Sequence, residues 1–166
     1  MDSLKFLAVI PARYASTRFP GKPLARLGGE PVIRHVWKQV TQVFADAAVA
    51  TDDPRIYDAV EAFGGRAVMT SPDHRSGTDR CREAVDKLGG APDVIVNVQG
   101  DEPFIAPSQL QAIARCFDDP STDIATLVKP FTEADGLDAL ENPNSPKVVI
   151  GSAGQALYFS RSVITY

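Results

Sequence analysis

The sequence predicts an α/β fold, a mainly parallel sheet flanked by helices, with an antiparallel hairpin near the C-terminus. Short apolar runs alternate with segments of about 10 to 15 residues in which apolar side chains recur at helical spacing, as in right-handed βαβ units. Near the end of the chain, 147–150 and 156–160 flank Gly151-Ser-Ala-Gly154, which favours a hairpin turn. The chain has 166 residues, 44% of them apolar, so one domain over 1–166 can bury a core without disulfides or metals.

The strands are expected where apolar residues follow one another, because a strand in a parallel sheet is buried on both faces. Lys5 is the one charged residue in the first run, and Asn97 interrupts the fourth. The expected strands are 4–10, 47–51, 66–70, 94–98 and 124–128.

The helices between these strands are expected to begin at prolines or capping residues and to end at glycine pairs. Gly64-Gly65 and Gly89-Gly90 are such ends. The expected starts are Pro31, Asp53-Pro54, Thr78 as a cap, and Pro107, with a further short helix after Thr132.

Charge and cysteine content exclude several classes of protein. The chain carries 17 basic and 21 acidic residues, which argues against a nucleic-acid binder. Residues 3–29 hold five basic side chains and no acidic one, which indicates one local anion site. Cys81 and Cys116 lie outside any CxxC pattern, so we expect neither a disulfide framework nor a zinc site. Two separate cysteines favour a reducing compartment, and we expect a cytoplasmic location. No run of 18 apolar residues predicts a membrane span, and the N-terminal apolar stretch indicates a buried strand instead of a signal peptide.

The first candidate loop, 11–23, follows the first strand. Small residues let backbone N–H groups approach an anion, and Arg13, Arg18 and Lys22 can neutralise phosphate charge. The loop is neither a Walker P-loop nor a GxGxxG motif. The alternative is a solvated basic loop whose prolines fix its course.

The second candidate is the end of the fourth strand, where Gln99, Gly100, Asp101 and Glu102 follow one another. A carboxylate at this position suits Mg²⁺, which takes one or two protein carboxylates and fills its other sites with water and phosphate oxygens. The alternative is an ordinary turn, since Gly, Asp and Pro are the usual turn residues.

The third candidate is the loop 73–80, which enters a helix. Ser76 and Thr78 can hydrogen-bond a base or ribose, and Gly77 allows close approach. The alternative is a loop followed by a helix cap. His74 has no Cys or His partner for a metal, and no GxSxG motif supports a nucleophilic triad.

Five motifs in one order give a resemblance to a known family. PARYASTRFPGKPL (11–24), ATDD (50–53), DHRSGTDR (73–80), VNVQGDEP (96–103) and ALYFSR (156–161) closely resemble the 3-deoxy-manno-octulosonate (KDO) cytidylyltransferases, from about residue 5 to residue 164. The resemblance implies a Rossmann-like nucleotidyltransferase fold. It also implies direct transfer of a cytidylyl group from CTP to KDO, with Mg²⁺, giving CMP-KDO and pyrophosphate for lipopolysaccharide biosynthesis.

The resemblance assigns roles to individual residues. Lys22 and Arg18 would neutralise the leaving pyrophosphate, Asp101 would bind Mg²⁺, and Gln99 would lie near the sugar. The residues that would hold the nucleotide are Pro11, Ala12, Arg13, Ser16, Ser76, Gly77, Thr78 and Arg80.

The same resemblance implies a homodimer for the full-length family and a chain that continues beyond the YFSR segment. The further part would supply a second metal-binding aspartate and most sugar contacts, so we expect these 166 residues to bind CTP–Mg²⁺ and to turn over little. Three alternatives stay open: a cytidylyltransferase for another acidic sugar such as sialic acid, a non-catalytic CTP-binding module, and a protein-interaction domain.

Overall fold

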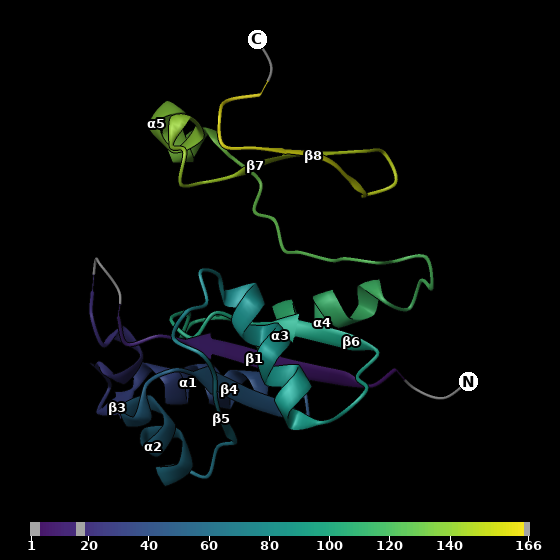
Figure 1. Cartoon of the computed structure of the whole chain (residues 1–166). Coiled ribbons are helices and arrows are strands. Elements are labelled where there is room, and N and C mark those ends of the chain that lie inside the picture. The colour runs from purple at the N-terminus through teal and green to yellow at the C-terminus, as the bar shows by residue number, and fades with distance from the viewer. Residues whose placement is uncertain (1–3, 16–18, 165–166) are drawn as a thin grey trace. The chain divides into compact units, whose positions relative to one another are not determined.

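The computed structural model describes residues 4–15 and 19–164 and groups the chain into two compact units, which we call unit 1 (1–121) and unit 2 (122–166) (Figure 1). The boundary falls in Asp118-Asp-Pro-Ser-Thr-Asp123, a run of turn-forming residues. The sequence suggests one domain over 1–166 and gives no linker. Two predicted site residues, Ser16 and Arg18, lie outside the described residues.

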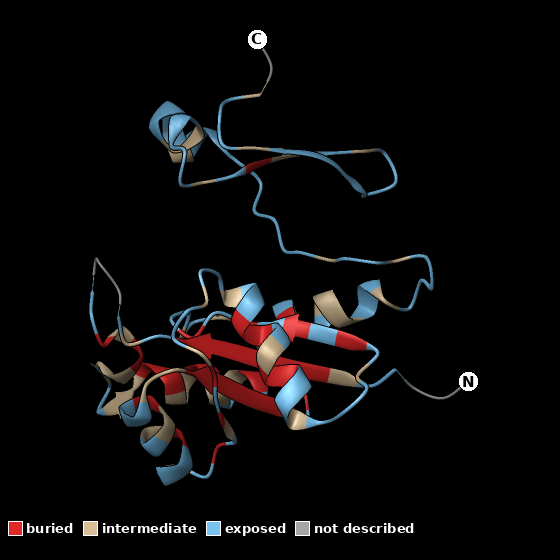
Figure 2. Ribbon diagram, viewed as in Figure 1, coloured by how far each residue is buried: buried red, intermediate tan, exposed pale blue. Residues whose placement is uncertain are grey.

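Unit 1 is built on a parallel sheet, as predicted. Its described strands have the order β5-β4-β1-β6, with β1 (Phe6–Ala12) between β4 (Ala47–Thr51) and β6 (Val94–Asn97), and β5 (Ala67–Met69) at the edge. β1 and β4 are buried almost throughout, which explains their unbroken apolar runs (Figure 2). The central position of β1 places the loops that follow β1 and β6 side by side.

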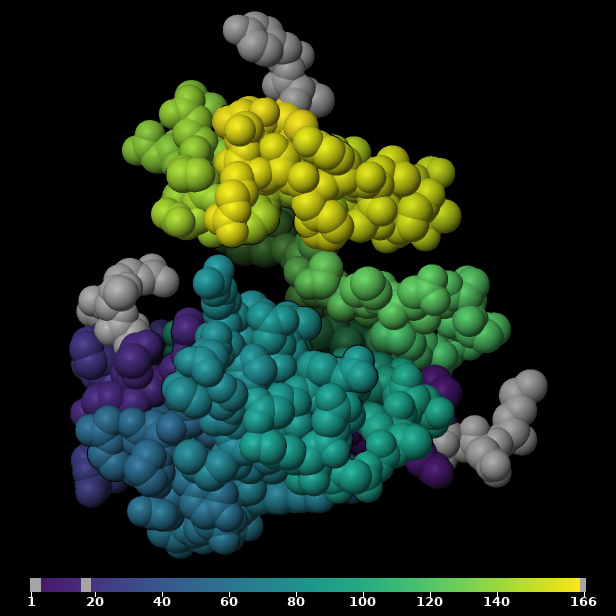
Figure 3. Space-filling model, in the orientation of Figure 1, coloured from purple at the N-terminus to yellow at the C-terminus, as the bar shows by residue number. Residues whose placement is uncertain are grey.

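Helices cover both faces of this sheet. Alternate residues of β1 point to opposite faces, so Ala8 and Ile10 share a core with α1 (Val32–Val40), α2 (Pro54–Ala62) and α4 (Pro107–Cys116). Leu7 and Val9 pack on the other face with Cys81, Ala84 and Val85 of α3 (Gly77–Leu88). Figure 1 shows α3 in front of β1, and in the space-filling view teal atoms fill the middle of this face of unit 1 (Figure 3). None of the helices in the described part of the chain is long and apolar enough to cross a membrane.

Two short elements connect β1 to α1. A 3₁₀ turn, η1 (Lys22–Leu24), is followed by the small antiparallel pair β2 (Arg26–Leu27) and β3 (Glu30–Pro31). Gly28 and Gly29 join that pair with φ angles of 58° and 88°, the positive values that a tight two-residue hairpin requires. This hairpin is not among the predicted elements, although its Gly-Gly pair is a turn signal.

Unit 2 contains the predicted C-terminal hairpin of β7 (Lys147–Ile150) and β8 (Ala156–Ser160), together with η2 (Glu133–Asp135) and α5 (Gly136–Glu141), which form the expected short helix. The predicted fifth strand, 124–128, is wrong, because this segment has no strand structure. Leu127 and Val128 instead line a cavity within unit 2. Leu127 and Val128 are exposed, so the apolar run here does not mark a strand buried in the parallel sheet.

Candidate functional site

The candidate site is a cavity of about 370 Å³ beyond the carboxyl ends of β1 and β6. Open parallel sheets bind their ligands at this edge. All three loops that the sequence singles out contribute to it. The described residues that line it are Pro11, Ala12, Arg13, Ala15, Lys22, Pro23, Gly77, Arg80, Gln99, Gly100 and Asp101.

Lys22 and Asp101, which are 79 positions apart in the chain, meet at this cavity. Lys22 Nζ donates to Asp101 Oδ2 over 2.8 Å, and the two side chains are 40% and 50% exposed. An exposed pair of this kind contributes at most about 1 kcal/mol, so a ligand can separate it at little cost. Two candidates that the sequence gives separately, the basic loop and the strand-end aspartate, therefore lie together at this edge of the sheet.

The backbone around Gly21 fixes the position of Lys22. Gly21 has a φ of 72°, and its N–H donates to the Tyr14 carbonyl over 2.8 Å, which closes the loop immediately before η1. The Arg55 guanidinium stacks 3.4 Å from the centre of the Tyr14 ring and is itself held by Asp53. Hydrogen bonding from Arg55 lowers the pKa of Asp53, so this support stays charged. Asp53 also caps α2, as predicted.

Gly100 fixes the position of Asp101. Its N–H donates to the Pro11 carbonyl over 3.2 Å, and a Cβ on Gly100 would lie 2.8 Å from that carbonyl oxygen. The next residues form a turn in which Glu102 N–H donates to the Gln99 carbonyl over 3.2 Å. The turn that the sequence offers as an alternative is therefore present, and it is the element that brings Asp101 to the cavity. Gln99 donates from Nε2 to Asn97 Oδ1 over 3.1 Å and lines the same cavity.

The third loop contributes the first residue of α3. Gly77 lines the cavity, and a Cβ added there would lie 3.3 Å from Pro11 Cγ. The predicted cap Thr78 is wrong, because Ser76 caps the helix by accepting from Asp79 N–H over 3.1 Å. The alternative interpretation, a loop followed by a helix cap, is therefore correct for Ser76. Thr78 lies in the first turn of α3. Neither Ser76 nor Thr78 is among the described lining residues.

Arg80 lines the cavity from inside the protein. Its side chain is 1% exposed, with Nη2 at 3.1 Å from Asp52 Oδ2 and Nη1 donating to the Thr70 hydroxyl. Within the described residues, neither Arg80 Nη2 nor Asp52 Oδ1 makes a hydrogen bond. Arg80 therefore joins the ends of β4 and β5 to α3. The pairing of Arg80 with Asp52 is not predicted, because it leaves no local sequence signal.

The comparisons with known proteins agree with this geometry. The sequence profile of the cytidylyltransferase family matches residues 7–166. The chain is 64% identical over 163 residues to a 3-deoxy-manno-octulosonate cytidylyltransferase of Phocaeicola vulgatus and to one of Bacteroides thetaiotaomicron, in each case covering 98% of this chain and 65% of the relative. A solved CMP:2-keto-3-deoxy-manno-octonic acid synthetase complexed with CTP superposes with a TM-score of 0.89 at 46% identity, covering 98% of this chain and 66% of that one.

The chain thus spans 65% of the length of these curated relatives. The family profile reaches from β1 to the last residue and includes every residue that lines the cavity. This chain belongs to the cytidylyltransferase family.

Proposed function

We propose that this chain binds CTP and takes part in transferring its cytidylyl group to KDO, giving CMP-KDO and pyrophosphate for lipopolysaccharide biosynthesis in the cytoplasm. The observation that carries the proposal is the contact of Lys22 with Asp101 across the cavity at the end of β1. The names of relatives that are 64% identical support CTP and KDO as the substrates.

The cations of the cavity suit a triphosphate. Lys22 and the exposed Arg13 line it together, and each can form charge-assisted hydrogen bonds with phosphate oxygens. The described lining residues include no serine, cysteine or histidine that would act as a nucleophile. We therefore propose direct attack by the sugar hydroxyl on the α-phosphorus, with catalysis by positioning and charge neutralisation.

The nucleoside would occupy the side of the cavity formed by α3 and the end of β1. Backbone groups of Pro11 and Ala12 could read the cytosine edge, Gly77 allows close approach, and Arg80 lines the cavity. Gln99 would face the sugar.

Asp101 fits a Mg²⁺ ion that arrives with the triphosphate. Its carboxylate is half exposed at the cavity and supplies the hard oxygen ligand that Mg²⁺ prefers. No cluster of three metal-binding side chains occurs among the described residues. Mg²⁺ would then take its other ligands from water and the nucleotide, and when bound it would neutralise charge on the phosphates.

Lys22→Ala is expected to weaken CTP binding about tenfold, because it removes a charge-assisted hydrogen bond to phosphate. The loss should shrink at high salt, because ions screen the contact. Isothermal titration at low and high ionic strength measures both effects. Lys38→Ala is the control, since Lys38 pairs with Glu30 outside the cavity. Equal affinity of wild type and Lys22→Ala would remove Lys22 from the site.

Asp101→Asn is expected to abolish the Mg²⁺ dependence of CTP binding while leaving the free energy of unfolding unchanged, because the side chain is exposed and its one ion pair lies at the surface. CTP titrations with and without Mg²⁺ measure this. The neighbouring Glu102→Gln should keep the dependence. If Asp101→Asn lowers the free energy of unfolding but CTP binding still depends on Mg²⁺, Asp101 stabilises the turn and does not bind the metal.

The transfer itself is tested by pyrophosphate release from CTP with KDO or N-acetylneuraminate as acceptor. Release with KDO supports the proposal. Release with N-acetylneuraminate alone would assign a different acidic sugar. CTP binding without release from either sugar, also after the further part of the family's chain is added back, would favour a nucleotide-binding module. If adding CTP and Mg²⁺ does not change the thermal stability of the protein, the chain does not bind CTP.

A further inference from the structure

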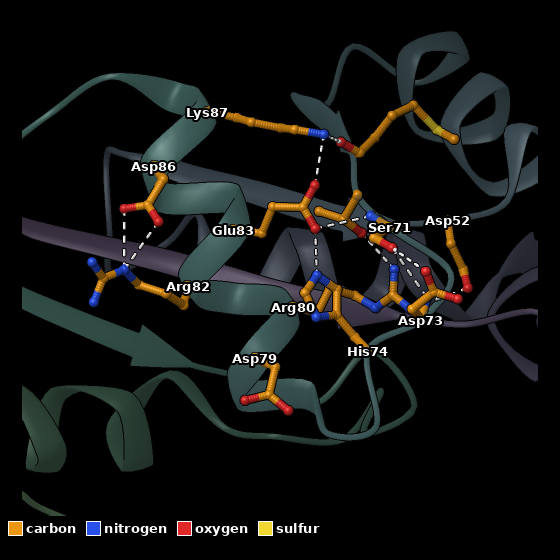
Figure 4. A network of polar contacts seen from close by, with 12 residues as sticks. Asp52, Ser71, Asp73, His74, Asp79, Arg80, Arg82, Glu83, Asp86 and Lys87 are labelled. Atoms are coloured by element: carbon orange, nitrogen blue, oxygen red, sulfur yellow. Dashed lines mark hydrogen bonds and ion pairs between the residues drawn. The ribbon is translucent and has the colours of Figure 1, made fainter.

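One face of α3 carries three charged residues at helical spacing, Arg80, Glu83 and Lys87, which we call the α3 stripe. The stripe faces the loop 70–76, which connects β5 to α3 (Figure 4). Its two ends hold the start of that loop. Arg80 Nη1 donates to the Thr70 hydroxyl, and Lys87 Nζ donates to the Met69 carbonyl over 2.8 Å.

Glu83, in the middle of the stripe, makes the most contacts with the loop. Its Oε2 accepts from Ser71 N–H over 2.9 Å and is also in contact with His74 Nε2. Its Oε1 lies 2.7 Å from Lys87 Nζ. The Glu83 and His74 side chains are 24% and 20% exposed, so these contacts are partly sheltered from solvent. One carboxylate thus joins two points of the loop to the helix.

These contacts keep Glu83 charged. Hydrogen bonds from Lys87, from Ser71 N–H and from His74 lower the pKa of Glu83 from 4.5 to about 2. A carboxylate with a lowered pKa stabilises the folded state above the unfolded value of 4.5, and this stabilisation is lost only as the pH falls toward 2. The contacts are therefore intact at neutral pH.

The loop ends where the cavity begins. His74 is followed two residues later by the cap Ser76. The next residue, Gly77, lines the cavity, and a Cβ added there would lie 3.3 Å from Pro11 Cγ. Little free space therefore separates Gly77 from Pro11. For this reason, the path of the loop determines the position of the first turn of α3 relative to a ligand. Lys22 and Asp101, on the phosphate side, are held by other segments of unit 1.

We propose that Glu83 is a positioning residue that fixes the loop 70–76, through Ser71 and His74, for binding of the nucleoside part of CTP. The inference rests on the proposed binding of CTP. If a loop becomes ordered only when the ligand binds, the free energy needed to order the loop weakens binding. Loss of the Glu83 contacts should therefore weaken binding of the nucleoside but not of the phosphates.

The test compares the affinities of the full chain for CTP and for pyrophosphate. Glu83→Ala should weaken CTP binding about tenfold, change pyrophosphate binding by less than about twofold, and speed hydrogen exchange at Ser71 N–H. Glu83→Gln keeps an acceptor for Ser71 and should retain most of the CTP affinity. Asp86→Ala is the matched control, because Asp86 pairs with Arg82 on the exposed side of the same helix and should leave both affinities unchanged.

The outcomes separate the two proposals. If Glu83→Ala binds CTP as tightly as wild type, the positioning role is overturned and the proposed function is not. An equal loss of affinity for CTP and for pyrophosphate has the same consequence. Wild type that does not bind CTP overturns the proposed function and this inference with it. If Glu83→Ala cannot be purified folded, His74→Ala removes one of the two loop contacts and carries the same expectation with a smaller loss.

Discussion

Arg80→Met is expected to lower the free energy of unfolding by about 3 kcal/mol, because it removes one partner of a buried ion pair. Arg80 is 1% exposed and Asp52 is 16% exposed, so the aspartate that remains cannot regain full hydration. The Thr70 hydroxyl loses its partner as well. Methionine keeps much of the side-chain length and apolar volume, so the effect reports on charge more than on a cavity. Denaturant unfolding at neutral pH measures it.

Two further variants separate the ion pair from a general effect on α3. Arg82→Met, on the exposed side of the helix, should change stability by less than about 0.5 kcal/mol. Adding Asp52→Asn to Arg80→Met should recover part of the loss, because the unpaired charge is then removed. If Arg80→Met is as stable as Arg82→Met, the buried pair does not support the site, and Arg80 acts through the ligand alone.

The fold is largely predictable because its signals are local. The run in β1 is apolar over its whole length, and that in β4 is apolar up to Thr51. Asp53-Pro54 specifies the start of α2 without reference to the rest of the chain. The segment 124–128 shows the limit of this approach. Four apolar residues and Thr126 have the composition of a strand whether or not they pair in a sheet, and only the tertiary structure distinguishes the two cases.

The site is predictable to the level of its loops but not of its supports. Parallel topology brings the residues after β1 and β6 to one edge of the sheet, where the structure shows the contact between Lys22 and Asp101. The Arg80–Asp52 pair and the Glu83 contacts arise between segments whose spacing carries no motif. The cap of α3 could have been found, because Ser76-x-x-Asp79 fits the capping-box pattern better than Thr78 does.

Gly100→Ala is expected to lower the free energy of unfolding by about 2 kcal/mol and to weaken Mg²⁺-dependent CTP binding as well. Gly100 is buried, and an added Cβ would lie 2.8 Å from the Pro11 carbonyl oxygen and 3.3 Å from Ile33 Cδ1. A backbone carbonyl in a central strand cannot move aside, so the strand-end turn must shift instead, which is the usual cost of overpacking. Denaturant unfolding and CTP titration measure the two effects.

A joint loss of stability and of Mg²⁺-dependent CTP affinity would show that Gly100 positions Asp101. A loss of stability alone would show only that Gly100 is tightly packed. Gly90→Ala is the control, because nothing lies within 4 Å of its added Cβ and its backbone is not in the left-handed region. A Gly100→Ala variant that loses stability but keeps its Mg²⁺-dependent affinity would mean that Asp101 reaches its ligand without the contact between Gly100 and Pro11. A shift of the turn should instead carry Asp101 away from Lys22, because Asp101 is the next residue in the chain and Lys22 is held independently through Gly21 and Tyr14.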